Sequence, residues 1–333
     1  MKFVIAGLGS IGRRHFRNLI NLGERVIVLF RSHKSTLPDD ELTGFPVETD
    51  LKAALEHKPD AVIITNPTSL HLEVALAAAE AGCHILIEKP VAQSQQGTER
   101  LLKKMQENRL IGAVGFQFRF HPGLRITHDL VKQGKLGSII SAQAFWGEYL
   151  PGWHPWEDYR KTYAARADLG GGVVRTLCHP LDYLTWMFGP VKTVYASVLS
   201  TGQLGIDVDD LTEIDLGFTN GTLGHIHLDY HRRPGSHTLS LIGTEGTLEW
   251  DNATGITRYL TTDMEQWREF IPAEGFERNT MFVAEMKNFL QAIKGLEEPA
   301  CSIEEGIYNM RLVDAVYQSG EEHKMIGLVE VDR

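Results

Sequence analysis

A glycine-rich turn near the first residue constrains the fold of this chain more than any other feature. The apolar run from Lys2 to Ala6 is followed at once by Gly7-Leu8-Gly9-Ser10-Ile11-Gly12, and residues 13–22 then carry apolar side chains at helical intervals. Glycines in such a turn let the backbone approach a pyrophosphate, which the amides and dipole at the helix start then hold. The pattern predicts a strand, a turn and a helix that bind a dinucleotide through Gly7, Gly9, Ser10, Ile11 and Gly12.

The residues after the second predicted strand, 25–30, bear on the choice of dinucleotide. An NAD-binding protein usually has an acidic residue there, which binds the adenosine ribose hydroxyls. Here the chain reads Arg31-Ser32-His33-Lys34. Cationic and hydroxyl groups suit a 2′-phosphate, so we expect Arg31 and Ser32 to favour NADP(H) over NAD(H). The alternative is a solvated loop and a protein that binds both cofactors.

A Glu-Lys-Pro sequence ends an apolar run at residues 85–87. Strands and helices alternate up to about residue 118, which indicates a doubly wound α/β domain with a parallel sheet. Charged residues at the carboxyl end of a buried parallel strand lie where ligands bind in such sheets. We therefore predict that Lys89 is catalytic, that Glu88 lies beside the cofactor, and that the Lys89–Pro90 peptide bond is cis.

Polar residues also follow the strand predicted at 61–65. Asn66 and Pro67 come directly after it, and His71 lies in the first turn of the next helix. Because parallel strands end at one edge of the sheet, we expect these three residues near Lys89 and the cofactor. The alternative is that Thr68 or Ser69 only caps the helix.

The second half of the chain has a different pattern. An irregular aromatic segment, residues 150–172, ends in three glycines, and a helix predicted over 173–188 carries His179 in a polar stripe. Close backbone approach at the glycines makes His179 a second catalytic candidate, although buried histidines are often structural. Residues 191–270 alternate as antiparallel hairpins, with His225 and His227 on the polar face. No metal is predicted, because this spacing is typical of a solvated sheet face or a subunit interface.

Length, charge and cysteine content bear on the number of domains, on the kind of partner and on the cellular compartment. A chain of 333 residues is expected to form two domains. With 33 basic and 43 acidic residues the net charge is -10, which argues against a nucleic-acid partner. No signal peptide or membrane-spanning run is recognised, and three scattered cysteines suggest free thiols. We therefore expect a cytoplasmic protein.

Taken together, the motifs resemble those of the Gfo/Idh/MocA oxidoreductases, a family named after glucose-fructose oxidoreductase and inositol dehydrogenase. The resemblance covers essentially the whole chain and rests on Gly7 to Gly12, Asn66-Pro67 with His71, Glu88-Lys89-Pro90, Arg119-Phe120-His121-Pro122, and Gly170-Gly171-Gly172 with His179 and Asp182. It implies an NAD(P)-binding Rossmann domain over residues 1–121. It also implies a substrate-binding domain over 122–333, whose open, mainly antiparallel sheet makes a homodimer or homotetramer.

The resemblance also assigns roles. Sugars, cyclitols and their derivatives are the implied substrates, with His179 as the principal acid/base and Lys89 as the group that binds the reacting oxygen. Histidine titrates near neutral pH, whereas lysine needs its charged form disfavoured before it can serve as a base. Aromatic side chains of the irregular segment suit the apolar faces of sugar rings. The expected substrate-side residues are Arg119, Trp153, His154, Tyr159, Tyr163, Arg175, Thr176 and Asp182; the alternative for the aromatic ones is a buried plug.

One departure from the family pattern bears on substrate and function. Many relatives carry an aspartate three or four residues before the histidine, where this chain has Thr176 and Arg175. Either the proton relay is shorter, or Asp182 or Tyr163 replaces the aspartate, or an arginine serves an anionic substrate. The resemblance as a whole leaves three possible functions. The one we favour is a sugar oxidoreductase; the others are a glycosidase that uses a retained nicotinamide and a regulator that binds the cofactor but catalyses no reaction.

Overall fold

The computed structural model describes residues 1–32 and 37–328, which form two compact units. The first unit contains Met1–Gln117 and also Glu277–Met310, and the second contains Phe118–Phe276 and the described residues from Arg311 onward. The expected division, 1–121 and 122–333, differs from the observed one slightly in its boundary, which lies after Gln117, and mainly in the return of residues 277–310 to the first unit. The reason is that a helix from this segment completes the hydrophobic core of the first unit, as described below.

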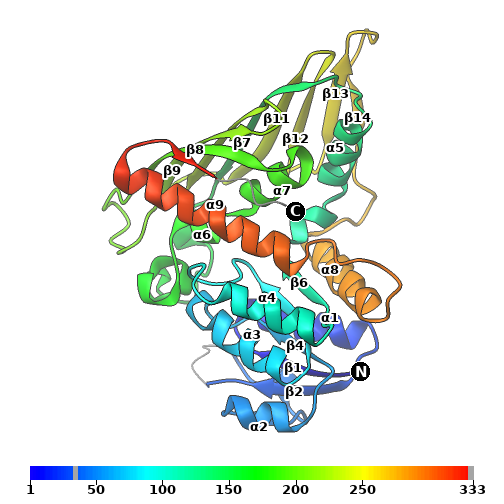
Figure 1. Ribbon diagram of the computed structural model, residues 1–333, viewed down its shortest axis with the longest axis vertical. Helices are drawn as coiled ribbons and strands as arrows, with labels where there is room; N and C mark the ends of the chain where they lie inside the picture. The colour runs from blue at the N-terminus through cyan, green and yellow to red at the C-terminus, as the bar shows by residue number, and fades with distance from the viewer. Residues whose placement is uncertain (33–36, 329–333) are drawn as a thin grey trace. The chain divides into compact units, whose positions relative to one another are not determined.

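The first unit is built on a parallel sheet of six strands in the order β3-β2-β1-β4-β5-β6 (Figure 1). This order places the reversal of the strand sequence between β1 and β4, where doubly wound folds bind ligands. The predicted Rossmann arrangement is confirmed. The strands are β1 (Lys2–Ala6), β2 (Val26–Phe30), β3 (Val47–Glu48), β4 (Ala61–Ile64), β5 (His84–Glu88) and β6 (Gly112–Gly115).

Helices connect these strands and cover the sheet. α3 contacts β4 and β5, and α1 contacts β1 and β4. Asp50 caps α2 by accepting a hydrogen bond from the amide of Ala53. The helices of this unit are α1 (Ser10–Asn21), α2 (Leu51–Glu56), α3 (His71–Glu80), α4 (Thr98–Glu107) and α8 (Arg278–Ile293).

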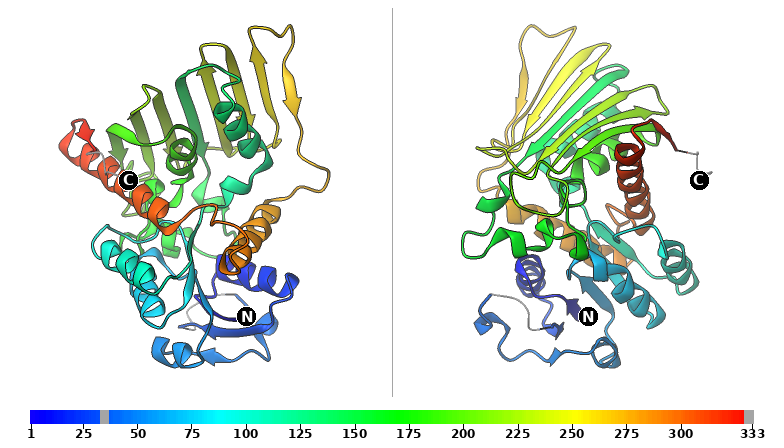
Figure 2. Two further views of the ribbon diagram at one scale, coloured as in Figure 1. Left: turned by 45° about the vertical axis from the view of Figure 1, so that its right-hand side comes forward. Right: turned by 90° about the vertical axis from the view of Figure 1, so that its left-hand side faces the viewer.

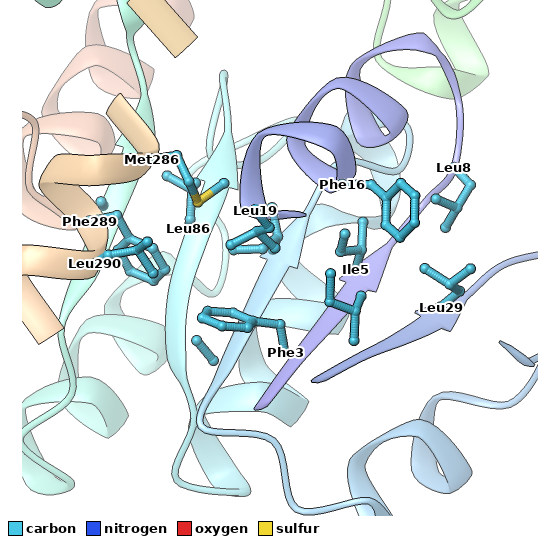
Figure 3. Close-up of a cluster of buried hydrophobic side chains, with 14 of the residues drawn as sticks. Phe3, Ile5, Leu8, Phe16, Leu19, Leu29, Leu86, Met286, Phe289 and Leu290 are labelled. Atoms are coloured by element: carbon cyan, nitrogen blue, oxygen red, sulfur yellow. The ribbon is translucent and has the colours of Figure 1, made fainter. Parts of the chain in front are cut away.

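The core on one face of this sheet includes α8 (Figure 3). Alternate residues of the central strands point to this face, and Phe3 and Ile5 of β1 are fully buried there. Phe16 and Leu19 of α1 join them, and α8 adds Met286, Phe289 and Leu290. Burying a side chain of this size stabilises a fold by roughly 1.5–3 kcal/mol. Phe3 and Leu290, 287 positions apart in sequence, thus share one core.

The second unit is built on a mixed sheet of nine strands in the order β14-β13-β12-β11-β7-β10-β9-β8-β15 (Figure 2). Among the described residues of this sheet, β7 and β10 are the only parallel pair. The predicted open, mainly antiparallel sheet is confirmed, including its two hairpins. The strands are β7 (Ile139–Gly147), β8 (Val191–Leu199), β9 (Leu211–Phe218), β10 (Leu223–Asp229), β11 (Ser236–Gly243), β12 (Gly246–Asp251), β13 (Thr257–Thr261), β14 (Arg268–Phe270) and β15 (Ile326–Gly327).

Helices cover one face of this sheet. They are α5 (Pro122–Lys132), α6 (Val173–Thr176) and α7 (His179–Phe188), and α9 (Ile303–Glu322) begins in the first unit and ends here. The single helix predicted over 173–188 is in fact two. Pro180 has no amide hydrogen to continue α6, but it fits the first turn of a new helix, so α7 starts at His179.

Two expectations about the whole chain can be compared with the structure. None of the helices in the described ranges is both long and apolar enough to cross a membrane. Cys83, Cys178 and Cys301 are buried, and none of them forms a disulfide bond, as predicted. Burial raises the pKa of the Cys83 thiol to about 11, so this thiol is unreactive at neutral pH.

Candidate active site

The glycine turn after β1 has the geometry of a dinucleotide cradle. Gly7 has φ +100°, and a Cβ atom there would lie 2.5 Å from the amide nitrogen of Asn66. A Cβ at Gly12 would collide with the carbonyl oxygen of Gly7, whereas one at Gly9 would meet nothing within 4 Å. Gly9 is the N-cap residue of α1. The turn is therefore closed on the sheet side and open at the helix start, as a pyrophosphate requires.

His71 joins the loops that follow β4 and β5. Its Nδ1 lies 2.8 Å from the carbonyl oxygen of Pro90, and its Nε2 lies 2.8 Å from that of Asn66. Burial lowers the pKa of His71, against the opposing effect of the two carbonyl groups. The Lys89–Pro90 peptide bond is cis, as predicted. The structure thus brings Asn66, Pro67, His71 and Lys89 together at the carboxyl edge of the sheet.

Glu88, at the end of β5, lies in a buried group of three ionisable side chains. His15 of α1 is 1% exposed, and its Nε2 lies 2.9 Å from Oε1 of Glu88. One oxygen of Glu285, from α8, completes a set of three atoms that lie within 4.8 Å of one another. Gly115 leaves room for the Glu88 carboxylate, because a Cβ there would lie 3.1 Å from it. The sequence did not single out His15 or Glu285.

Arg31, the predicted NADP determinant, is buried rather than exposed. Its Nη1 donates to Oδ1 of Asp39 at 2.7 Å, and Nη2 of Arg13 donates to the same oxygen at 3.0 Å. The hydrogen bond from Arg31 lowers the pKa of Asp39, which stays ionised. Ser32 is exposed, and His33 and Lys34 lie outside the described residues.

In the second unit, His179 is the first residue of α7 and is 1% exposed. Its ring packs edge-on against Phe118, with the centroids 4.9 Å apart, and lies 5.4 Å from Trp146. His237 stacks on the same tryptophan at 4.2 Å. Burial lowers the pKa of His237 well below its usual value, so that imidazole is neutral at physiological pH. His179 therefore lies in an aromatic, low-dielectric environment.

Two of the predicted substrate residues bind each other. Nη2 of Arg119 donates to Oδ1 of Asp182 at 2.7 Å, and Nε donates to Oδ2 at 3.0 Å. The two side chains are 3% and 2% exposed. This forked, buried ion pair joins the segment after β6 to α7. The carboxylate of Asp182 is thereby engaged one turn after His179.

Arg175 and Thr176, at the position of the family aspartate, lie in α6. The guanidinium carbon of Arg175 is 4.3 Å from the ring centroid of Tyr317. Its Nε is buried and has no hydrogen-bond partner among the described residues. Asp209 lies nearby and accepts hydrogen bonds from the Tyr317 hydroxyl and the Val174 amide, each 2.9 Å long. Burial raises the pKa of Asp209, although Arg175 opposes this. Thr176 is buried.

The aromatic segment divides into packed and exposed side chains. Trp153 packs edge-on against Tyr230, and the Tyr159 hydroxyl donates to the carbonyl oxygen of Leu204 at 2.8 Å. His154 stacks on Trp156, whose side chain is 62% exposed. Tyr163 is 40% exposed. Tyr163 and Trp156 are therefore available to a ligand, while Trp153 and Tyr159 serve mainly to fix the segment.

Ion pairs cover the polar face of the second sheet. His227 lies 2.6 Å from Glu213 and 3.0 Å from Asp229, and His225 lies 2.8 Å from Asp215. A shallow hollow of about 290 Å³ is lined by these histidines and their neighbours on β7 and β11. The histidines thus already have carboxylate partners from the adjacent strand and their own strand.

Sequence reasoning missed three acidic residues: Asp39, Asp209 and Glu285. Glu285 alone had a detectable signal, because it lies three or four positions from Met281, Phe282 and Phe289, on the apolar side of α8. The partners of Asp39 and Asp209 are set by loop conformation. No sequence periodicity indicates them.

Comparisons with known proteins agree with this architecture. Residues 1–116 match the family model described as an oxidoreductase family with an NAD-binding Rossmann fold, and residues 124–249 match that of the GFO/IDH/MocA C-terminal domain. The chain is 34% identical over 280 residues to 4-carboxy-2-hydroxymuconate-6-semialdehyde dehydrogenase of Sphingobium sp., with 80% of this chain and 82% of that protein covered.

Two other similarities extend over almost the whole chain. D-xylose 1-dehydrogenase (NADP(+)) 2 of Haloferax volcanii is 26% identical, over 96% of this chain and 98% of that protein. The solved structure of a levoglucosan dehydrogenase in complex with NADH superimposes with a TM-score of 0.88 at 19% identity, covering 99% of this chain and 100% of the other. This last likeness shows the fold.

Proposed function

Because this chain belongs to the Gfo/Idh/MocA family of NAD(P)-dependent oxidoreductases, we propose that it transfers a hydride between NADP(H) and a secondary alcohol or ketone of a sugar, cyclitol or sugar derivative. The observation that carries the proposal is the edge of the first sheet. There the glycine cradle, the His71 bridge and Lys89 all lie at the carboxyl ends of β1, β4 and β5. A bound nicotinamide would supply the hydride acceptor or donor.

The protein residues would manage the proton and the charge on oxygen. When an alcohol is oxidised, its hydroxyl proton must leave as the carbonyl forms. We assign that proton to His179, since imidazole titrates near neutral pH. Lys89 would donate a hydrogen bond to the reacting oxygen and so stabilise the negative charge that develops there. Glu88 and the His71 bridge, on either side of Lys89 in the chain, support its position.

The preference for NADP(H) rests on Arg31 and Ser32, which follow β2. Asp39 holds the Arg31 guanidinium in one place, so that the cation is already ordered at the end of the strand. The similarity to a dehydrogenase named for NADP(+) supports this cofactor. The residues Gly7, Gly9, Ser10, Ile11 and Gly12 would bind the pyrophosphate of either cofactor.

A second candidate is that the substrate carries a carboxylate. Arg175 stands where many relatives have an aspartate, and its Nε lacks a partner among the described residues. A buried guanidinium donor favours an anionic acceptor. The relative of 34% identity is named for a carboxylated substrate. Tyr163 and Trp156 would then contact the apolar part of the substrate.

The exposed polar face of the second sheet suits a homodimer or homotetramer contact. The ion pairs between β9 and β10 lie at the surface, and their histidines are partly exposed. Such a face can pair with its own copy through complementary charges. Sedimentation analysis of the parent and of His225→Glu tests this assembly.

The function is tested by a screen of sugars, cyclitols, sugar acids and nucleotide sugars for change in absorbance with NADP and NADPH. With a substrate in hand, Lys89→Ala and His179→Ala should each lower kcat by roughly 100- to 10,000-fold, as expected for loss of an acid/base group. Lys103→Ala, on the exposed side of α4, serves as the control. Turnover at the parental rate in both variants contradicts the assignment. Glycoside cleavage without net NADPH consumption indicates a glycosidase.

A further inference from the structure

The most unusual electrostatic feature of the first unit is a pair of buried carboxyl groups, Glu88 and Glu285. Glu285 is 4% exposed, and neither of its oxygens has a hydrogen-bond partner among the described residues. Its side chain is directed at Glu88 and His15, with one oxygen within 4.8 Å of both. Two ionised carboxylates at this separation repel strongly in a low-dielectric interior. Something positive must therefore balance one of the two charges.

Two species can balance this charge: a proton or a bound cation. Nε2 of His15 and Oε1 of Glu88 lie 2.9 Å apart, at hydrogen-bond distance, so these two atoms already satisfy each other without a cation. A histidine that binds a metal usually donates its other ring N–H to an acceptor. Nδ1 of His15 has no such partner in the part of the chain that the structure describes. This arrangement disfavours a cation bound through Nε2 of His15 and favours a proton on Glu285.

We propose that Glu285 is a protonated positioning residue, which donates its proton to Glu88 and so fixes the carboxylate that precedes Lys89. A small rotation of the Glu285 side chain would bring its oxygen to hydrogen-bond distance of Glu88, because the two groups already have oxygens within 4.8 Å of each other. Burial raises the pKa of Glu285 well above its usual value, and the neighbouring Glu88 raises it further. Burial by itself would raise the pKa of Glu88, but the hydrogen bond from His15 and the neighbouring basic groups lower it.

The surrounding charges are consistent with one proton held by this group. His15 and Arg14 approach from α1, and Lys89 and His71 approach from the loop after β5 and from α3. Arg14 packs over Phe282, one turn before Glu285 in α8. With Glu88 ionised and Glu285 neutral, the pair carries a single negative charge beside the cation of Lys89. Glu285 would thus limit the negative charge that Lys89 experiences and hold Glu88 in one orientation.

The first test needs no substrate. Infrared difference spectroscopy of the full-length protein should show the carbonyl stretch of a protonated carboxylic acid, shifted in D2O, at neutral pH. Glu285→Gln should abolish this band, whereas Glu304→Gln, at an exposed site in the first turn of α9, should leave it. Metal analysis of the same samples should find less than one equivalent of any divalent metal. Absence of the band, or a stoichiometric metal that Glu285→Gln loses, overturns the proposal.

The second test concerns Lys89 and rests on the proposed function. Glutamine keeps the shape and the donor of the protonated acid, so Glu285→Gln should retain the parental pH profile of kcat. Glu285→Leu removes the donor, and we expect kcat to fall roughly 10- to 100-fold, as for loss of a hydrogen bond to a charged group, with a displaced pH profile and little change in KM. If both substitutions lowered kcat equally and left its pH profile unchanged, the positioning role would be contradicted. Failure to find any substrate would affect the proposed function alone, since the infrared result stands independently.

Discussion

Each unit contains a buried group of charged side chains, and the two groups differ in how completely their polar atoms have hydrogen-bond partners. In the second unit, both carboxylate oxygens of Asp182 accept hydrogen bonds from Arg119 in a forked pair, and the charges cancel. In the first unit, Glu88 has a donor in His15, but Glu285 has none among the described residues. The first arrangement is complete without any ligand and builds structure. The second is incomplete and adjoins Lys89, as the positioning role proposed for Glu285 requires.

The largest expected effect comes from breaking the satisfied pair. Arg119→Met leaves the Asp182 carboxylate buried without its cation, and we expect the free energy of unfolding to fall by about 3–5 kcal/mol. The double variant Arg119→Met/Asp182→Leu should recover most of this loss, because it removes both charges. Denaturant titration of the parent and variants measures both effects. If the single and double variants were equally unstable, the pair would not be a charge-compensated structural element.

Arg31 is an intermediate case, since Asp39 binds its Nη1 while its buried Nε has no partner among the described residues. Arg31→Ala should raise the apparent Kd for NADP by roughly 10- to 100-fold, as expected for loss of a hydrogen bond to a charged group. The Kd for NAD should change much less. Arg17→Ala, in the exposed part of α1, is the matched control. A parallel loss of affinity for both cofactors would show that Arg31 only supports the fold.

The unsatisfied group makes a prediction about stability and pH. As pH rises above about 4.5, the ordinary pKa of a glutamate, Glu285 loses its proton in the unfolded chain but keeps it in the folded protein. The stability contributed by this group is therefore present below that pH and is lost as pH rises toward the raised folded pKa. Relative to Glu285→Gln, the parent should lose about 1.4 kcal/mol per pH unit in this window. Urea unfolding at a series of pH values measures the slope, and parallel curves would mean that Glu285 is ionised when folded.

The exposed ion pairs of the second sheet should give the smallest effect. The hydrogen bonds that His227 donates to Asp229 and Glu213 raise its pKa, against the effect of its partial burial. Its stabilising effect is complete below the unfolded pKa of about 6.5 and is lost as pH rises through the folded value. Solvent screens this half-exposed group, so His227→Gln should cost less than about 1 kcal/mol at low pH. Melting temperatures on both sides of neutrality test this; a larger loss would place His227 in a buried interface.

Secondary structure and turns that depend on residues close together in sequence could be predicted. Gly7 to Gly12 required a strand, a tight turn and a helix, and the alternation after Val191 required antiparallel hairpins. Partners distant in sequence could not be predicted in this way. The return of residues 277–310 to the first unit depends on where α8 can bury Met286 and Phe289. The predicted roles of Lys89 and His179 came from family resemblance, whereas the partners of Asp39 and Asp209 depend on loops that have no periodicity.

The returning segment also affects how the protein is made. Residues 1–117 leave the ribosome long before α8 has been synthesised, yet their hydrophobic core includes Met286, Phe289 and Leu290. Part of the apolar surface of the nascent first unit therefore stays exposed while the whole second sheet is translated. A chain cut after residue 121 would keep that surface permanently exposed and prone to aggregation. The unit that is synthesised first is the one that can finish folding only near the end of synthesis.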